Sequence, residues 1–364
     1  MAVGMRRAFL MGDPLHWGAR GRADRAEARR EWRDLHDLLR DLGAATIVIA
    51  PQLAHPDLAL PATLGFLTPL DAEKPLSEKR FVLANAAPAR SGSRRHVRQL
   101  LAQYGFRVEG LDERFHVEGG ADFFPAGDPY VLALGGAEPP RLVVALGVPP
   151  WRRVPGTQPA SPAAEPVLRA LVAPRPVLRV ALAPRRIGRG DTALCAFGPG
   201  RRHLLVHAAS LAPEGLALLR DVFHDRVVEI DDADAARGAA GALALQLGAE
   251  CMLVMPEGVS ERLRGEVKER GATPLAAPFR ALARGAGGAL RRLALDLGPV
   301  AADRLAIAAP PAEPLAAAAQ APARTMPAVA AGAPSAAPAA ATARPGDGVR
   351  LGEAPGPETG TAPS

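Results

Sequence analysis

The clearest candidate for chemistry in this chain is an acidic turn that reads Phe-His-Val-Glu-Gly-Gly-Ala-Asp and ends at Asp122. Its glycine pair, Gly119 and Gly120, predicts a tight turn that brings the carboxylates of Glu118 and Asp122 close together. Two neighbouring carboxylates suit a planar guanidinium group, which forms paired hydrogen bonds with them. The alternative is an acidic turn that binds no ligand, and these residues alone leave both interpretations open.

Two more segments place a polar or glycine-rich turn in front of a short apolar run. Asp191 precedes the run that contains Cys195, and a glycine-rich turn at 285–288 precedes the run from Leu293 to Val300. A flexible turn that leads into a buried strand allows a side chain at the strand start to face a crowded centre. Each segment is a weak signal by itself.

The chain contains two cysteines, Cys195 and Cys251, which we expect to be buried and unreactive. Two cysteines in 364 residues do not form a disulfide framework, which favours a reducing compartment. The N-terminal segment has no apolar stretch followed by a small-residue cleavage site, and no apolar run approaches the ~18 residues of a membrane span. The sequence therefore predicts a cytoplasmic protein without membrane contact.

The remaining motifs argue against a cofactor. His203 and His207 are four residues apart, but Leu204–Val206 between them is typical of a strand, in which that spacing does not direct two imidazoles to one metal ion. No zinc, phosphate-loop or dinucleotide fingerprint occurs. We therefore expect no metal and no cofactor.

The basic charge is not evidence for nucleic-acid binding. The formal net charge is +6 with a pI near 10.1, but the basic residues are almost all arginine and are spread along the chain, and aromatic residues make up 4%. A nucleic-acid surface usually has clustered charge with aromatics between. We expect no nucleic-acid partner; a basic nucleic-acid-associated protein is the weakest of three functional hypotheses.

A helix followed by a short strand recurs at a spacing of about fifty residues, which indicates a closed α/β array. The expected helices, each followed by a strand, cover Glu27–Leu42, His96–Tyr104, Ala164–Ala173, Pro213–Phe223 and Glu257–Arg270. Five such units would form a barrel-like propeller with loops that converge on its axis. We place this body at 1–307. The segment 308–364 is dominated by Ala and Pro, and we expect it to be a disordered tail.

Taken together, the motifs resemble those of the guanidino-group-modifying enzymes, the group of arginine deiminases, dimethylargininases and amidinotransferases. The matching segments are Phe9–His16, Glu118–Asp122, Asp191–Cys195, Met255–Pro256 and Gly287–Leu297. They correspond to the family's Pro-Pro-x-His strand end, its Glu-Gly-x-Gly-Asp motif, the end of its His-Leu-Asp-Thr-x-x-Cys motif, a Met-Pro after a strand, and its terminal glycine-rich turn. The resemblance covers about residues 7–300 and implies the pentein fold, a five-bladed α/β propeller.

The resemblance also implies a site, in which a cysteine thiolate attacks the guanidinium carbon, a histidine moves protons and acidic residues hold the substrate. Glu118, Asp122 and Asp191 match the acidic positions. The catalytic positions are degenerate, because the family histidine falls on Arg189 and the family cysteine on Arg292. Two asparagine positions of the family are also changed; they fall on Thr63 and Gly241.

These replacements predict a pseudoenzyme. Arginine stays protonated near neutral pH, so it is neither a nucleophile nor a base. Because the carboxylates persist while Arg189 and Arg292 occupy the catalytic positions, we expect one or both arginines to pair with Glu118, Asp122 or Asp191; the alternative is that both point to solvent. The first hypothesis is thus an inactive relative with a binding, scaffold or regulatory role, whose partner is a guanidino compound, another small molecule or a protein. The second is an active hydrolase or amidinotransferase acting on arginine-like substrates.

Overall fold

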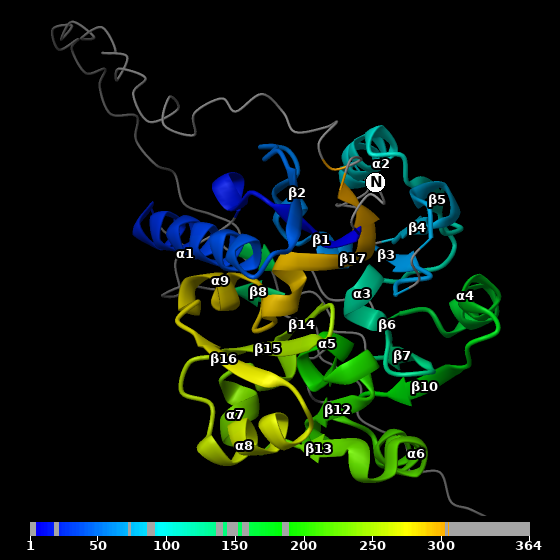
Figure 1. Ribbon diagram of the computed structural model, residues 1–364, viewed down its shortest axis with the longest axis vertical. Helices are drawn as coiled ribbons and strands as arrows, with labels where there is room; N and C mark the ends of the chain where they lie inside the picture. Colours follow the sequence, from blue (N-terminus) through cyan, green and yellow to red (C-terminus); the bar gives the residue numbers. More distant parts are fainter. Residues whose placement is uncertain are drawn as a thin grey trace, which may run out of the picture. The chain divides into compact units, whose positions relative to one another are not determined.

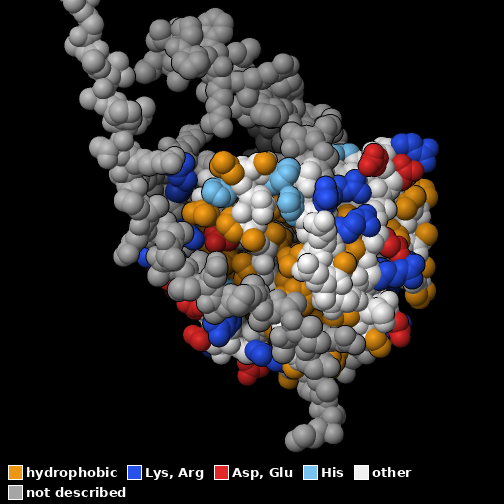
Figure 2. All heavy atoms as spheres, turned by 90° about the horizontal axis from the view of Figure 1, so that it is seen from above, with side chains coloured by type: hydrophobic (Ala, Val, Ile, Leu, Met, Phe, Trp, Pro, Cys, Tyr) orange, Lys and Arg blue, Asp and Glu red, His pale blue; other side chains and the backbone are white. Residues whose placement is uncertain are grey.

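The computed structural model describes residues 5–17, 22–71, 74–85, 92–135, 141–143, 152–154, 160–183, 189–302 and 305 (Figure 1; coloured by side-chain type in Figure 2). These residues form a mixed α/β fold built from small sheets. The segment 308–364, predicted to be a disordered tail, lies outside them. None of the described helices is both long and apolar enough to cross a membrane.

Five sheets of three strands share one design. In each sheet the first strand is antiparallel to the middle strand, and the middle strand is parallel to the last. The sheets, in the order first, middle, last strand, are β17 (Ala294–Ala301), β1 (Met5–Gly12) and β2 (Ala45–Ile49); β3 (Gly65–Thr68), β4 (Arg80–Leu83) and β5 (Arg107–Gly110); β6 (Phe123–Pro125), β7 (Tyr130–Leu134) and β10 (Val177–Ala181); β11 (Leu194–Phe197), β12 (His203–Val206) and β13 (Val227–Glu229); and β14 (Leu243–Leu247), β15 (Glu250–Pro256) and β16 (Thr273–Ala277).

A helix connects the middle strand of each sheet to the last, because a parallel pair requires a crossover. These helices are α1 (Arg22–Asp41), α2 (Ser93–Gln103), α4 (Glu165–Val172), α6 (Pro213–Phe223) and α8 (Glu261–Glu269), and Figure 1 shows them on the outside of their sheets. Two further helices are α7 (Asp232–Ala236) and α9 (Arg280–Gly285), and a two-stranded sheet joins β8 (Arg141–Val143) to β9 (Arg152–Val154).

The predicted helix–strand units are confirmed, with shifted boundaries. The helix expected over Glu257–Arg270 begins only at Glu261, because the side chain of Ser260 caps it by accepting a hydrogen bond from the Leu263 amide. Gly258 just before it has a φ of +83°, which ends any helical path from Glu257.

A short helical turn precedes the first strand of every sheet. We call these five the inner turns: η3 (Pro61–Thr63), α3 (Gly119–Asp122), α5 (Gly190–Ala193), η10 (Ala239–Gly241) and η11 (Leu290–Leu293). Within them α3 contacts η3 and α5, α5 contacts η10, and η11 contacts η3. Gly241 of η10 packs directly against Gly288 and Ala289, the residues that lead into η11.

The apolar core is divided into five clusters, each between two sheets. Leu10 packs with Phe81, Phe66 with Tyr130, Val131 with Leu204, and Leu205 with Leu253. The last cluster joins Val254 back to Phe9 of the first sheet. Each sheet therefore shares a core cluster with the sheets before and after it, and the last sheet shares one with the first. The inner turns, which lead into these sheets, contact one another within this arrangement.

Candidate functional site

The predicted site residues lie in the inner turns or directly before them, and the central feature is an ion pair between Arg292 and Asp191. Nε and Nη2 of Arg292 donate to the two carboxylate oxygens of Asp191, each over 2.5 Å, in the paired geometry typical of arginine and carboxylate. The remaining nitrogen, Nη1, donates to the carbonyl oxygen of Ala286 over 2.8 Å. Arg292 is 8% exposed and Asp191 is completely buried.

The charges of this pair stabilise each other. Burial by itself favours the neutral form of Asp191, but the Arg292 guanidinium outweighs burial and lowers the pKa of the carboxyl. Burial likewise opposes the charge of Arg292, and Asp191 reverses that effect and raises the pKa of the guanidinium. Both groups are therefore charged throughout the neutral pH range.

A second arginine completes the predicted pairing. Arg189, which immediately precedes α5, forms an ion pair through Nη1 with Oε2 of Glu118, the residue before α3. The Glu118 side chain is 2% exposed, so this pair is also shielded from water. Glu118 and Asp122 therefore do not share one guanidinium, as the acidic turn by itself suggested, because Arg189 pairs with Glu118 alone.

Asp122 takes part in a different way. Its Oδ2 accepts a hydrogen bond of 2.9 Å from the backbone amide of Glu118, which closes the turn. Burial and the nearby charge of Asp191 raise the pKa of Asp122 to about 7. Asp122 therefore titrates near neutral pH.

Neither cysteine is arranged as a nucleophile. Both are buried, as predicted. The thiol of Cys195 donates to the carbonyl oxygen of Ala242 over 3.3 Å, and burial raises its pKa. Burial also raises the pKa of Cys251, so both favour the unreactive neutral thiol.

The two positions that correspond to family asparagines differ in their surroundings. A Cβ atom added to Gly241 would lie 2.4 Å from the carbonyl oxygen of Gly288 and 2.5 Å from the Cα of Ala289, so this position has no room for a side chain. The hydroxyl of Thr63 donates to the carbonyl oxygen of Leu60 and is thus engaged within its own turn.

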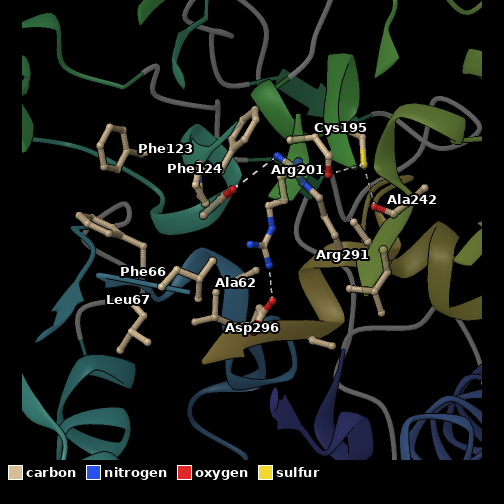
Figure 3. A pocket seen from close by; sticks show the side chains of 18 residues that line it. Ala62, Phe66, Leu67, Phe123, Phe124, Cys195, Arg201, Ala242, Arg291 and Asp296 are labelled. Carbon is tan, nitrogen blue, oxygen red and sulfur yellow. Dashed lines mark hydrogen bonds and ion pairs between the residues drawn. The ribbon is translucent and has the colours of Figure 1, made fainter. Parts of the chain in front are cut away.

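Sequence reasoning missed one residue, Arg291, which lies beside the ion pair but points elsewhere. Its guanidinium stacks on the ring of Phe124 at 4.3 Å, and it lines a cavity of about 100 Å³ together with Cys195 (Figure 3). The sequence Leu-Arg-Arg-Leu could have indicated this residue, because two adjacent side chains in a turn project in different directions. The family motif, however, matches only the second arginine, Arg292.

A network of four charged residues was also missed. Arg7 donates to Asp296 (2.9 and 2.7 Å) and to Asp71 (2.7 Å), and Arg201 donates to both carboxylates as well. The two arginines lower the pKa of Asp71 to about 2 despite its partial burial. These residues come from strands and loops far apart in the sequence, so no local pattern could reveal them.

The fold of this chain is shared with guanidino-modifying enzymes of known structure. ArgZ, an arginine dihydrolase from the ornithine–ammonia cycle in cyanobacteria, matches with a TM-score of 0.64 and 17% identity over 80% of this chain, which covers 40% of full-length ArgZ and 98% of its N-terminal domain. AgrE in complex with L-arginine matches with a TM-score of 0.64 and 20% identity, over 80% of this chain and 40% of AgrE.

A dimethylarginine dimethylaminohydrolase matches with a TM-score of 0.57 and 14% identity, over 80% of this chain and all of that enzyme. No family model matches the sequence, and no curated protein matches it. The structures therefore confirm, at the level of the fold, the resemblance that the motifs predicted. The chain spans about 40% of the full-length arginine dihydrolases that it matches.

Proposed function

We propose that this chain is a catalytically silent pentein, a five-bladed relative of the guanidino-modifying enzymes whose substrate position is filled by its own arginine. The observation that carries the proposal is the buried contact of Arg292 with both oxygens of Asp191. An arginine side chain presents the same guanidinium group as an arginine substrate. Because Asp191 is already occupied, a free guanidino compound cannot form this paired contact with it.

The surrounding groups support the same conclusion. Arg292 has a raised pKa and cannot attack a guanidinium carbon or accept a proton. Arg189 is held by Glu118, so the second degenerate position is engaged as well. The inner turns keep the geometry of the site while its reactive groups are gone, and the role that remains is binding, scaffolding or regulation in the cytoplasm.

The cyclic core contacts support the five-bladed arrangement. The first sheet takes β17 from the end of the body and β1 from its beginning, so the two ends of the folded chain pair in one sheet. Such pairing is how a chain of repeated units is fastened into a ring. A ring also explains why five turns from distant parts of the sequence meet.

Activity measurements test directly whether the chain is catalytically inactive. Incubation with arginine, dimethylarginine or agmatine should release neither citrulline nor ammonia, because no thiolate is available to attack. ArgZ provides the positive control under the same conditions. Thiol-dependent turnover that is lost in Cys195→Ser or Cys251→Ser would contradict the proposal.

Chemical rescue tests whether Arg292 occupies a guanidinium site. Arg292→Ala should lower the melting temperature, and millimolar ethylguanidinium should restore part of the loss by binding Asp191. Arg220→Ala serves as the control, because Arg220 pairs with Glu229 on the surface. Equal responses of the two variants to ethylguanidinium would show that the position does not act as a guanidinium site.

A further inference from the structure

The cavity beside the ion pair is lined by the guanidinium of Arg291, which forms no ion pair among the described residues. Among the described residues, Arg292 is paired with Asp191 and Arg189 with Glu118. Arg201, which also lines the cavity, is engaged by two carboxylates. Arg291 has no carboxylate within salt-bridge distance in the part of the chain that the structure describes.

The contacts of Arg291 leave donors of its guanidinium available. Its face is covered by Phe124, but stacking uses the face of the group and not the N–H bonds at its edge. Nη2 makes one long hydrogen bond of 3.4 Å to the carbonyl oxygen of Gly120, and the guanidinium also interacts with the thiol of Cys195. Nε is buried and has no hydrogen-bond partner among the described residues, which is costly for a charged donor.

The rest of the cavity is apolar. Three aromatic rings and several aliphatic side chains form most of its wall: Phe66, Leu67, Phe123, Phe124, Leu243 and Leu295. Two guanidinium groups, of Arg201 and Arg291, and one carboxylate, of Asp296, are the charged groups on the wall (Figure 3). Arg201 and Arg7 share the carboxylates of Asp71 and Asp296, and the charges of these four residues cancel. The guanidinium of Arg291 is therefore the charged group on the wall that lies outside this network.

We propose that this cavity binds a small monocarboxylate with a short apolar tail, whose carboxylate pairs with Arg291. A guanidinium edge matches a carboxylate with two parallel hydrogen bonds, and the apolar wall would surround the tail. The cavity of about 100 Å³ has room for a tail of only a few carbon atoms, so we take butyrate as the largest probe. The proposal is independent of whether the site at Arg292 is silent, because the two arginines use different partners.

Calorimetric titration of the full-length protein with sodium butyrate tests this site. We expect one saturable site with a Kd of roughly 1 mM, as is usual for a ligand of so few atoms. Butyramide, which has the same shape as butyrate without the charge, should bind at least about tenfold more weakly than butyrate. Chloride, added as sodium chloride at the same ionic strength, should also bind at least about tenfold more weakly than butyrate.

Two variants locate the site. Arg291→Met should weaken butyrate binding at least about tenfold, whereas Arg220→Met, the same change at an exposed position, should leave it unchanged. Should Arg291→Met fail to fold, Ala244→Leu fills the same cavity from its wall and should abolish binding without altering any charge. Equal binding of butyrate and butyramide, no saturable binding, or full butyrate affinity in a folded Arg291→Met or Ala244→Leu protein would overturn the proposal.

Discussion

Replacing Arg292 with alanine should be among the most destabilising single changes in this protein. The substitution removes three hydrogen bonds, two to Asp191 and one to the carbonyl oxygen of Ala286. It leaves the charge of a fully buried carboxylate without its partner. Breaking a buried ion pair in this way costs about 3–5 kcal/mol of the free energy of unfolding.

A double-mutant cycle separates the pair from the rest of the site. Arg292→Met keeps most of the side-chain volume, and Asp191→Asn keeps the shape of the carboxylate without its charge. Each single change should cost several kcal/mol, while the double variant should recover much of the loss, since replacing both members of a buried pair is often close to neutral. The coupling energy should exceed about 1.5 kcal/mol, because charged hydrogen bonds are broken.

Urea denaturation followed by circular dichroism measures these free energies. Arg220→Ala is the matched control, because Arg220 and its partner Glu229 are 56% and 44% exposed and such pairs contribute about 1 kcal/mol or less. A loss of less than about 1 kcal/mol for Arg292→Ala, equal to that of the control, would refute the buried pairing.

Three further measurements follow from the structure. Burial and a neighbouring carboxylate hold the pKa of Asp122 at about 7, above the ~3.9 of an ordinary aspartate, so between these pH values the native state keeps a proton that the unfolded chain releases. The free energy of unfolding should therefore fall, by on the order of 4 kcal/mol, as the pH rises from about 4 to about 7. In urea titrations, Asp122→Asn should remove this pH dependence of the free energy of unfolding, whereas the surface change Asp221→Asn should not. An equal pH dependence in the two variants would refute the raised pKa of Asp122. Gly241→Asn should lower the free energy of unfolding by at least about 1–3 kcal/mol, because the added Cβ would meet a backbone carbonyl oxygen at 2.4 Å. The control Gly265→Asn, with open space around it, should lower it by less than about 1 kcal/mol. If Gly241→Asn lowers the melting temperature no more than the control does, the close packing is wrong. Deleting 308–364 should leave the melting temperature nearly unchanged, and a large decrease would show that this segment packs on the body.

The helix–strand units were predictable because each depends on local patterns. The helix over Pro213–Phe223 was placed to the residue, since a proline at its first position and apolar residues at helical spacing mark it. The start of the following unit was misplaced by four residues, because the cap at Ser260 depends on a hydrogen bond that a periodicity argument does not include. The cyclic order of the core clusters depends on long-range packing, which local patterns do not contain.

The site was predictable in its members but not in its pairs. Glu118, Asp122, Asp191, Arg189 and Arg292 were all identified from motif positions. Which carboxylate pairs with which arginine depends on the contacts among α3, α5 and η11, and these are set by the packing of three separate sheets. The proton of Asp122 could not be foreseen either, because its pKa reflects burial and the distance to Asp191 in the folded chain.

The two ion pairs also connect inner turns that belong to different sheets. Arg292 joins η11 to α5, and Arg189 joins the start of α5 to the start of α3. A buried pair is rarely more stable than apolar residues of the same volume, so stability alone does not explain why five charged residues occupy this position. A charged pair does penalise every arrangement in which its members are apart, because each would then be a buried, unpaired charge. We infer that Arg292 and Arg189 fix the relative positions of η11, α5 and α3 through these two ion pairs.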